Sequence, residues 1–449
     1  MDGERTPTFA LTGATVVVSL DPPLVQNSDV VLAGDRVAAL GTAPAGLPRR
    51  DCSGTIVMPG NVCAHHHLYS ALARGMPYDL APPTNFLEIL QRVWWRLDRA
   101  LDEESIRASA LRGGIDALLA GTTSIVDHHA SPEAIAGSLD VVADALGELG
   151  VRSVLCYEVT DRDGERRAGA GIAENVRFAH QQRTLARGMI GAHASFTLSD
   201  ATLSALAEAA RGTGTGIHIH VAEDGVDEDD AVARFGRRVV ERLEAGGALT
   251  ERALLAHCVH VDGNESQLIA RSQATVVCNH RSNMNNGVGY SPFGRASSGR
   301  VALGTDGIGG DMFAEAAAGF FRTKEETLQN APDWPLTRLA EGARFVANAF
   351  GETHLGTLHP GAPADIVVLD LPAPTPLDGG NLAGHFVFGF GAGRVRDVYV
   401  AGEAVVIDHR LTRVDEAELA EHSRREARRL WDRMDRLPAH EFSPREAWK

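Results

Sequence analysis

The sequence contains a pair of histidines, one residue apart, directly after an apolar stretch. Residues 58–67 are Met-Pro-Gly-Asn-Val-Cys-Ala-His-His-His. Side chains alternate in direction along a strand, so His65 and His67 project to one side and His66 to the other. Two neutral imidazoles side by side are suitable ligands for a divalent metal. The pair alone is weak evidence, because histidines in turns are more often ordinary core or surface residues.

A second group of ionisable residues lies in the stretch Gly216-Ile-His-Ile-His-Val-Ala-Glu. His218 and His220 share one face of the predicted strand, and His220 is the better candidate ligand because it is nearer the strand's end. His218 is interpreted as a core or supporting imidazole. Glu223 follows where the chain leaves the strand, and a carboxyl group in a partly desolvated cleft is suited to proton transfer near neutral pH. The alternative is a carboxylate that only stabilises a helix N-terminus.

Two further strand ends carry candidate groups, His257 after Ala-Leu-Leu-Ala and Asp306 after Val-Ala-Leu-Gly-Thr. An aspartate before glycine is, taken alone, a common turn residue. His67 and His220 are 153 residues apart, His220 and His257 are 37 apart, and His257 and Asp306 are 49 apart. These separations are about what whole numbers of strand–helix units would give. Four unrelated turn residues at such positions are improbable, so the pattern predicts a metal site.

The elements that must position these residues lie between about 59 and 350. Short apolar segments alternate there with helical patterns, which predicts strand–helix units and a parallel sheet. The candidate strands are 57–65, 122–129, 151–159, 188–195, 216–223, 253–260, 275–282 and 301–308. Eight is the number that closes a (β/α)8 barrel, or TIM barrel, whose active site forms where the strands end. The predicted fold class is therefore α/β.

Both ends of the chain show a different pattern, with short alternating or β-branched runs separated by Gly, Pro and Asp turns. This pattern predicts a β-sandwich that flanks the barrel and is built from both chain ends. An amphipathic pattern from 416 to 437 predicts a helix on the surface. The expected organisation is a first part of the sandwich at 1–58, the barrel at 59–350, a second part of the sandwich at 351–412, and a C-terminal helix and tail at 413–449.

Composition limits the class of partner. The formal net charge of −16 argues against nucleic acid and anionic membranes. No apolar run reaches the roughly 18 residues of a membrane helix, and no signal-peptide pattern follows Met1. The five cysteines form no Cys-x-x-Cys pair, as expected of reduced thiols. We expect a cytoplasmic protein without a nucleic-acid or membrane partner, which forms a homodimer or higher homo-oligomer.

The combined motifs resemble a known family. The His-x-His pair, the His-x-x-Glu motif and the strand-ending His and Asp are similar to the amidohydrolase superfamily, specifically its branch of deaminases and triazine hydrolases with one metal. Longer stretches, among them HHHLYSALARGMP, GTTSIVDHHASP and LGTDGIGGDMF, look most like the aminohydrolases called SsnA. The resemblance covers nearly the whole barrel and both flanks.

The resemblance implies a role for each candidate by its position. It implies four metal ligands, which are His65, His67, His220 and Asp306. Glu223 would be the proton shuttle, and His257, with Asp306, would orient or deprotonate the attacking water. His280 stands where relatives tend to have proline, so the turn after the seventh strand is expected to differ.

The lysine content bears on the number of metal ions. Binuclear members of the superfamily bridge their metals with a carboxylated lysine at the end of the fourth strand. This chain has Ala192 and His193 there, and its only lysines are Lys324 and Lys449. One divalent ion is therefore expected. Zinc is the first choice, and iron or manganese would also accept nitrogen and oxygen ligands.

Other strand ends supply candidates for substrate contacts, which are His193, His129, Glu158 and Arg162. His193 is implied by the resemblance. The alternative for His129 is a structural role, and for Glu158 and Arg162 a solvated loop. Trp94 and Trp95 lie on a helical pattern and are interpreted as packing residues, after a loop that is long enough to form a lid.

The resemblance implies hydrolytic deamination of an amino-substituted N-heterocycle, purine-like or related. The metal would lower the pKa of water so that hydroxide attacks the carbon that bears the amino group. Glu223 would protonate the adjacent ring nitrogen, and ammonia would leave. An alternative reaction keeps the metal and hydroxide but opens a cyclic amide, or displaces another leaving group from a heterocycle. A catalytically silent assembly protein would require lost ligands, and none is missing from this sequence.

Overall fold

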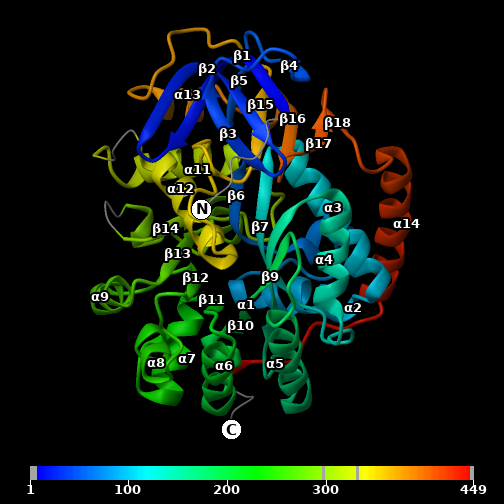
Figure 1. Ribbon diagram of the computed structural model, residues 1–449. Coiled ribbons are helices and arrows are strands. Elements are labelled where there is room, and N and C mark those ends of the chain that lie inside the picture. Colours follow the sequence, from blue (N-terminus) through cyan, green and yellow to red (C-terminus); the bar gives the residue numbers. More distant parts are fainter. Residues whose placement is uncertain (1–7, 296–298, 330–332, 445–449) are drawn as a thin grey trace.

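The structure, a computed structural model, describes residues 8–295, 299–329 and 333–444. At its centre is a parallel barrel, and a second sheet that contains strands from both chain ends lies against it (Figure 1). The predicted α/β class, a TIM barrel with a second sheet built from both ends, is confirmed. Lys449 and the end of the predicted tail lie outside the described residues.

Eight parallel strands form the barrel in the order β6, β7, β8, β10, β11, β12, β13 and β14, and the short β9 pairs with β8. Their bounds are Asn61–His66 (β6), Thr122–His129 (β7), Arg152–Val159 (β8), Ala186–Gly188 (β9), Ile190–Ala194 (β10), Ile217–Val221 (β11), Leu254–His257 (β12), Thr275–Cys278 (β13) and Val301–Leu303 (β14). Every residue of the eight is buried, as expected for parallel strands covered on both faces.

The barrel closes at the residues that carry candidate ligands. The backbone N–H groups of Thr305 and Asp306 both donate to the carbonyl oxygen of His65, at 2.9 and 3.1 Å. The N–H of His67 donates in turn to the carbonyl of Asp306, at 3.2 Å. This seam brings Asp306, which follows the last strand, beside the histidine pair of the first strand.

The first predicted strand, 57–65, is in fact two strands in different sheets. β5 (Ile56–Pro59) belongs to the chain-end sheet, and β6 begins after Gly60. A Cβ atom at Gly60 would lie 2.2 Å from the side chain of Thr123, so the chain crosses between the sheets where only glycine fits. A continuous apolar run hid this break from the sequence analysis.

The second sheet joins the two ends of the chain in the order β18, β17, β16, β15, β5, β1, β2 and β3, and β4 pairs with β1. The remaining bounds are Phe9–Leu20 (β1), Pro23–Ala33 (β2), Arg36–Gly41 (β3), Arg49–Asp51 (β4), Ile366–Leu369 (β15), Val395–Val400 (β16), Glu403–Ile407 (β17) and Arg410–Leu411 (β18). β5 and β15 pair antiparallel and tie the N-terminal part to the C-terminal part. Apolar side chains of both parts, including Leu11, Val57 and Ile366, share one core.

Helices surround the barrel (Figure 1). Their bounds are Phe86–Ile89 (α1), Trp95–Ala100 (α2), Glu103–Leu119 (α3), Ser138–Leu149 (α4), Glu165–Ala179 (α5), Asp200–Thr213 (α6), Gly225–Phe235 (α7), Val239–Ala245 (α8), Gly263–Ser272 (α9), His280–Asn286 (α10), Met312–Glu326 (α11), Trp334–Phe350 (α12), Leu382–Phe388 (α13) and Glu416–Met434 (α14). Short helical turns are η1 (Leu68–Ala73), the π-helical η2 (Leu90–Trp94), η3 (Ser195–Thr197), η4 (Pro292–Gly294) and η5 (Ala392–Arg394).

The C-terminal helix α14 has one buried face and one exposed face, as the amphipathic pattern predicts. Leu430 and Met434 on its inner face are buried, and the indole N–H of Trp431 donates to the carbonyl of Leu72 at 2.9 Å. Of the helices in the described ranges, none is long and apolar enough to cross a membrane. The domain boundaries given above stay predictions, as do the cytoplasmic location and the homo-oligomer.

Candidate metal centre and active-site pocket

Four side chains from three distant strand ends converge at the top of the barrel, namely those of His65, His67, His220 and Asp306. One ligand atom from each lies within 4.8 Å of all the others, and all four residues are buried. The Asp306 Oδ1 atom is 3.0 Å from His67 Nε2 and 3.5 Å from His65 Nε2, and His67 Nε2 is 3.1 Å from His220 Nε2. The predicted ligand set is thus brought together.

The orientation of two of these imidazoles suits a cation between them. His67 Nδ1 lies 2.6 Å from the carbonyl oxygen of His128, and His220 Nδ1 lies 2.9 Å from that of His193. A carbonyl only accepts, so each Nδ1 carries a proton, and in the neutral ring each Nε2 then has a lone pair. Two lone pairs would then face each other at 3.1 Å, which a shared positive charge makes favourable.

His65 is prepared as a neutral ligand. Its Nδ1 atom is 2.8 Å from Nε2 of His218, and within the described part of the chain its own Nε2 has no hydrogen-bond partner. Burial lowers the pKa of His65 to about 3, which keeps the ring neutral and its Nε2 free. His218 therefore has the supporting role proposed for it, because it fixes the direction of a ligand.

Asp306 completes the set from an unusual backbone conformation, with φ at 53°. Burial alone would raise the pKa of its carboxyl group, but the contacts with His65 and His67 hold that pKa well below the usual range. Its second oxygen, Oδ2, accepts a hydrogen bond from the hydroxyl of Ser282. The carboxylate is thus charged and fixed at both oxygens.

Three imidazoles and one carboxylate suit a divalent transition metal, and their geometry favours one ion. A second group of potential ligands adds His128 and Glu158 to His67 and His220. The two groups of ligands share His67 and His220. The Nδ1 atoms of both rings face carbonyl groups, so either group could bind a metal only through the same two Nε2 atoms. They compete for one cation and do not offer separate sites for two.

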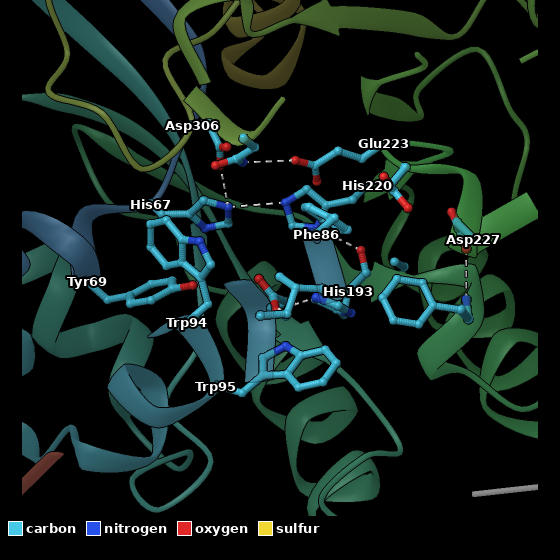
Figure 2. Close-up of a pocket in the computed structure, with 16 residues that line it drawn as sticks. His67, Tyr69, Phe86, Trp94, Trp95, His193, His220, Glu223, Asp227 and Asp306 are labelled. Atoms are coloured by element: carbon cyan, nitrogen blue, oxygen red, sulfur yellow. Dashed lines mark hydrogen bonds and ion pairs between the residues drawn. The ribbon is translucent and has the colours of Figure 1, made fainter. Parts of the chain in front are cut away.

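Glu223 lines the pocket beside Asp306, and the buried His257 lies next to both, since one polar atom of each of the three is within 4.8 Å of the others. Figure 2 shows Asp306 and His67 facing Glu223 and His220 across the upper part of the pocket. Glu223 Oε2 is 3.5 Å from His257 Nε2, and burial raises the pKa of Glu223 to about 7. His257 Nδ1 lies 2.8 Å from the amide oxygen of Asn283 and donates to it, so Nε2 is the nitrogen that faces Glu223.

Strained backbone accompanies three of these strand ends. Ala222, His257, Cys258 and Asp306 have φ values of 44°, 72°, 49° and 53°, in the left-handed region that residues with a Cβ rarely adopt. Such conformations cost of order 1–3 kcal/mol each and persist where surrounding structure enforces them. These four lie where β11, β12 and β14 end, at the same edge of the barrel as the candidate ligands.

The ligands open into a pocket with aromatic walls. The wall opposite Glu223 comes from the segment that follows β6, and its lining residues are Tyr69, Phe86, Leu90, Trp94 and Trp95. The Trp94 ring lies against the backbone of Gly307, the residue after Asp306. A Cβ atom at Gly307 would be 2.2 Å from that ring. The prediction that Trp94 and Trp95 are packing residues was incomplete, since both also line the pocket.

The structure places the four predicted substrate contacts differently. His193 and Glu158 line the pocket, and His193 Nε2 is 3.6 Å from Glu158 Oε1. Arg162 is buried behind the wall, paired with Asp98. His129 Nε2 is 3.0 Å from the hydroxyl of Ser131, and neither Arg162 nor His129 is among the lining residues that the structure describes.

Several functional residues were not found from the sequence. His128 lies near the ligands, with its ring centroid 4.8 Å from that of His220, whereas its neighbour His129 contacts Ser131. Ser282 and Asn283 come from α10, the helix that begins at His280. Their spacing on that helix was visible, but nothing in the sequence showed which side chains the helix would meet.

Comparison with known proteins shows the family. Residues 56–405, most of the chain, match the amidohydrolase family. The chain belongs to the amidohydrolase family. The family is metal-dependent, in agreement with the four converging ligands of this amidohydrolase. The resemblance stated from the motifs, and the expectation of a hydrolase acting on carbon–nitrogen bonds, are both confirmed.

Curated relatives of this amidohydrolase are full-length matches. It is 30% identical over 420 residues to the 5-methylthioadenosine/S-adenosylhomocysteine deaminase of Desulforudis audaxviator, covering 90% of this chain and 94% of the relative. It is 29% identical over 377 residues to the 5′-deoxyadenosine deaminase of Methanopyrus kandleri, covering 82% and 85%.

Solved structures share the fold. An adenosine deaminase from Xanthomonas campestris with bound zinc superimposes with a TM-score of 0.83 at 23% identity, covering 95% of this chain and 99% of the other. The zinc complex of the atrazine chlorohydrolase TrzN from Arthrobacter aurescens has a TM-score of 0.80 at 20% identity, covering 94% and 100%. At these identities the likeness concerns the fold.

Proposed function

We propose that this amidohydrolase removes the exocyclic amino group of an adenine-type nucleoside by hydrolysis, with one zinc ion bound by His65, His67, His220 and Asp306. The observation that carries the proposal is that Glu223 and His257 lie beside the ligand Asp306, with polar atoms of the three within 4.8 Å of one another. The names of the full-length relatives support deamination and the adenosine-type substrate. Zinc is supported by two solved structures of the same fold.

The chain's own residues would divide the proton transfers between them. A divalent cation in this site lowers the pKa of water by several units and so provides hydroxide near neutral pH. His257, with its free Nε2, would orient the attacking water. Glu223, whose pKa of about 7 leaves it partly protonated, would protonate the ring nitrogen next to the attacked carbon. It would then carry a proton from the water to the amino group, which leaves as ammonia.

The pocket walls would bind the base and what is attached to it. Trp94 and Phe86 offer aromatic faces, which suit a flat heterocycle. Glu158 and His193 lie deeper, and their facing polar atoms would bind hydrogen-bond donors of the substrate. Arg162, 3.9 Å from Glu158, would act through that carboxylate. A role for His129 in binding substrate stays a prediction.

The substrate class can be tested with purified protein loaded with zinc. We expect 5′-deoxyadenosine, 5-methylthioadenosine or S-adenosylhomocysteine to release one ammonia per molecule consumed, and removal of the metal by a chelator to abolish turnover until zinc is restored. Turnover of a heterocycle without ammonia would instead support opening of a cyclic amide or loss of another leaving group. Absence of bound metal after loading would contradict the proposal outright.

The role of Glu223 predicts a specific defect. Glu223→Gln should keep the metal content, because Glu223 is not a ligand, and should lower kcat about 100-fold to 10,000-fold, because proton transfer is lost. The matched control is Glu228→Gln, since Glu228 is also buried but bonds the backbone N–H of Val239 and does not line the pocket. Near-normal kcat in Glu223→Gln would show that the assignment is wrong.

A further inference from the structure

A buried carboxylate on α7 connects two neighbouring strand ends of the barrel. Asp227 is 2% exposed, and its Oδ1 atom accepts the backbone N–H of Phe196 at 2.9 Å. Its Oδ2 atom accepts the backbone N–H of Ala222, also at 2.9 Å. Phe196 lies in η3, after β10, and Ala222 follows β11. One side chain therefore ties together two adjacent barrel strands where they end.

The Ala222 bond acts on the residue next to the proposed proton shuttle. Ala222 has φ at 44°, and this conformation directs the chain so that Glu223 reaches over the metal ligands. The carbonyl of Ala222 accepts the N–H groups of Val259 and His260, at 3.1 and 2.9 Å. The strained residue is therefore held on its carbonyl side by the β12 loop and on its N–H side by Asp227 alone among the described residues.

The other oxygen of Asp227 orders part of the pocket wall. Phe196 lines the pocket, and it lies two residues after Ala194, which with His193 forms the end of β10. Figure 2 shows Asp227 at the edge of the pocket, beyond His193. The same carboxylate thus sets the position of the aromatic side chain and of the strand end that carries Glu223.

A general role at a helix N-terminus does not explain Asp227. The N-cap of α7 is Asp224, whose carboxylate accepts the N–H of Val226 at 3.0 Å. Both oxygens of Asp227 are instead used by groups outside the helix. Burial of this carboxyl group is costly and raises its pKa to about 7, so a feature that only stabilised the helix would be better placed in solvent.

We propose that Asp227 is a positioning residue for catalysis, which holds Ala222 in its left-handed conformation and thereby fixes Glu223 over the metal. The inference rests on the proposed role of Glu223. Asp227 touches neither the metal ligands nor Glu223 through its own hydrogen bonds, so its effect passes through the backbone. A displacement of about 1 Å at a reacting group can lower the rate about 100-fold.

The variant that tests this is Asp227→Asn. An amide of the same shape can accept only one of the two N–H groups, because its other end is a donor. We expect unchanged metal content and faster hydrogen exchange in peptides that contain Ala222, measured by mass spectrometry. We also expect kcat for the best nucleoside substrate to fall about 100-fold, which exceeds any change in KM.

A double variant separates positioning of Glu223 from other effects. In a Glu223→Gln background, Asp227→Asn should lower kcat no further, because the group it positions is already inactive. If Asp227→Asn lowered kcat by the same factor in the wild-type and in the Glu223→Gln background, the inference would be wrong. So would a fall in metal content that parallels the fall in kcat, since Asp227 would then support the ligands.

The matched control is Asp230→Asn on the same helix. Asp230 is buried and bonds Arg234, which donates to the carbonyl of Phe196 at 3.1 Å, so it supports η3 without contacting Ala222. This variant should change kcat less than about threefold and leave the exchange of the Ala222 peptide as it was. Equal defects in Asp230→Asn and Asp227→Asn would show a general packing effect and refute the assignment.

Two outcomes distinguish this inference from the proposed function. Normal kcat in Glu223→Gln refutes the function of Glu223, whereas an impaired Glu223→Gln with a normal Asp227→Asn refutes only the inference. Should Asp227→Asn not fold, Ala222→Val opposes the left-handed conformation with the carboxylate intact, because β-branched residues rarely adopt a positive φ. It should lower kcat several-fold at constant metal content, and an unchanged kcat there would overturn the inference.

Discussion

The two walls of the pocket differ in how they are built. The first wall, here called the strand wall, carries the candidate metal ligands on strand ends. Asp306, His67 and His220 are fixed there by backbone contacts and by the closing seam of the barrel. The opposite wall, here called the helical wall, contains Phe86 and Trp94. It is formed by short helical segments in the long stretch after β6. The contrast indicates that the chemistry is placed on the rigid part of the fold and recognition on the part that can vary.

The helical wall owes its position to a distant part of the chain. The tail after α14 lies behind it, where the N–H of His440 donates to the carbonyl of Gln91 and the side chain of Gln91 donates to the carbonyl of Phe442. The rings of His440 and Phe442 pack on Trp95, with centroids 5.4 and 5.8 Å away. The tail therefore supports the pocket from outside the barrel.

The strongest test of the comparison is removal of a ligand on the strand wall. Asp306→Asn should lose most bound zinc and lower kcat about 1,000-fold or more, because several kcal/mol of charge stabilisation depend on the ion. Elemental analysis and ammonia release measure the two effects. Full zinc content together with near-normal kcat would show that the strand wall does not hold the metal.

A smaller effect should follow from removing the support of one ligand. His218→Phe keeps the ring volume but removes the nitrogen that faces His65 Nδ1, and should weaken zinc binding about 10-fold to 100-fold. Competition with a chromogenic chelator measures the affinity. The control is His280→Phe, a buried histidine whose ring packs on Trp334 away from the ligands, and it should bind zinc normally. Equal losses of zinc affinity in His218→Phe and His280→Phe would contradict a specific role for His218.

The smallest effect should come from the helical wall. Trp94→Ala should raise KM for the nucleoside about 10-fold, as expected for the loss of one aromatic stacking partner, while the zinc content stays constant. The control is Trp431→Ala on α14, whose indole bonds the carbonyl of Leu72 outside the pocket. A fall in zinc content in Trp94→Ala would break the comparison, because the helical wall would then also support the metal.

The strand wall was predicted well because parallel strands leave a strong pattern. Short apolar runs that end in His or Asp indicated the side of the barrel on which His220 and Asp306 would meet. The helical wall left a weaker pattern. The period of Phe86, Leu90 and Trp94 gives the apolar face of a helix, but it does not say whether that face meets the core or a substrate pocket.

Local ambiguity explains the remaining misses. His128 and His129 are adjacent on β7, so alternation says only that one of them faces the ligands, and the register of the barrel decides that it is His128. Asp227 was invisible for another reason. Its partners are backbone N–H groups of Phe196 and Ala222, which every sequence has, so no residue type marks the contact.

By itself the sequence determined the barrel and the chain-end sheet and indicated the four candidate metal ligands, because hydrophobic period and chemical type are properties of the residues in order. Only the tertiary structure decided how close the ligands come, which nitrogen of each imidazole is free, and which helices and tail residues complete the pocket. The physical reason is that these depend on the closing seam at His65 and Asp306 and on packing between segments hundreds of residues apart, which no local pattern encodes.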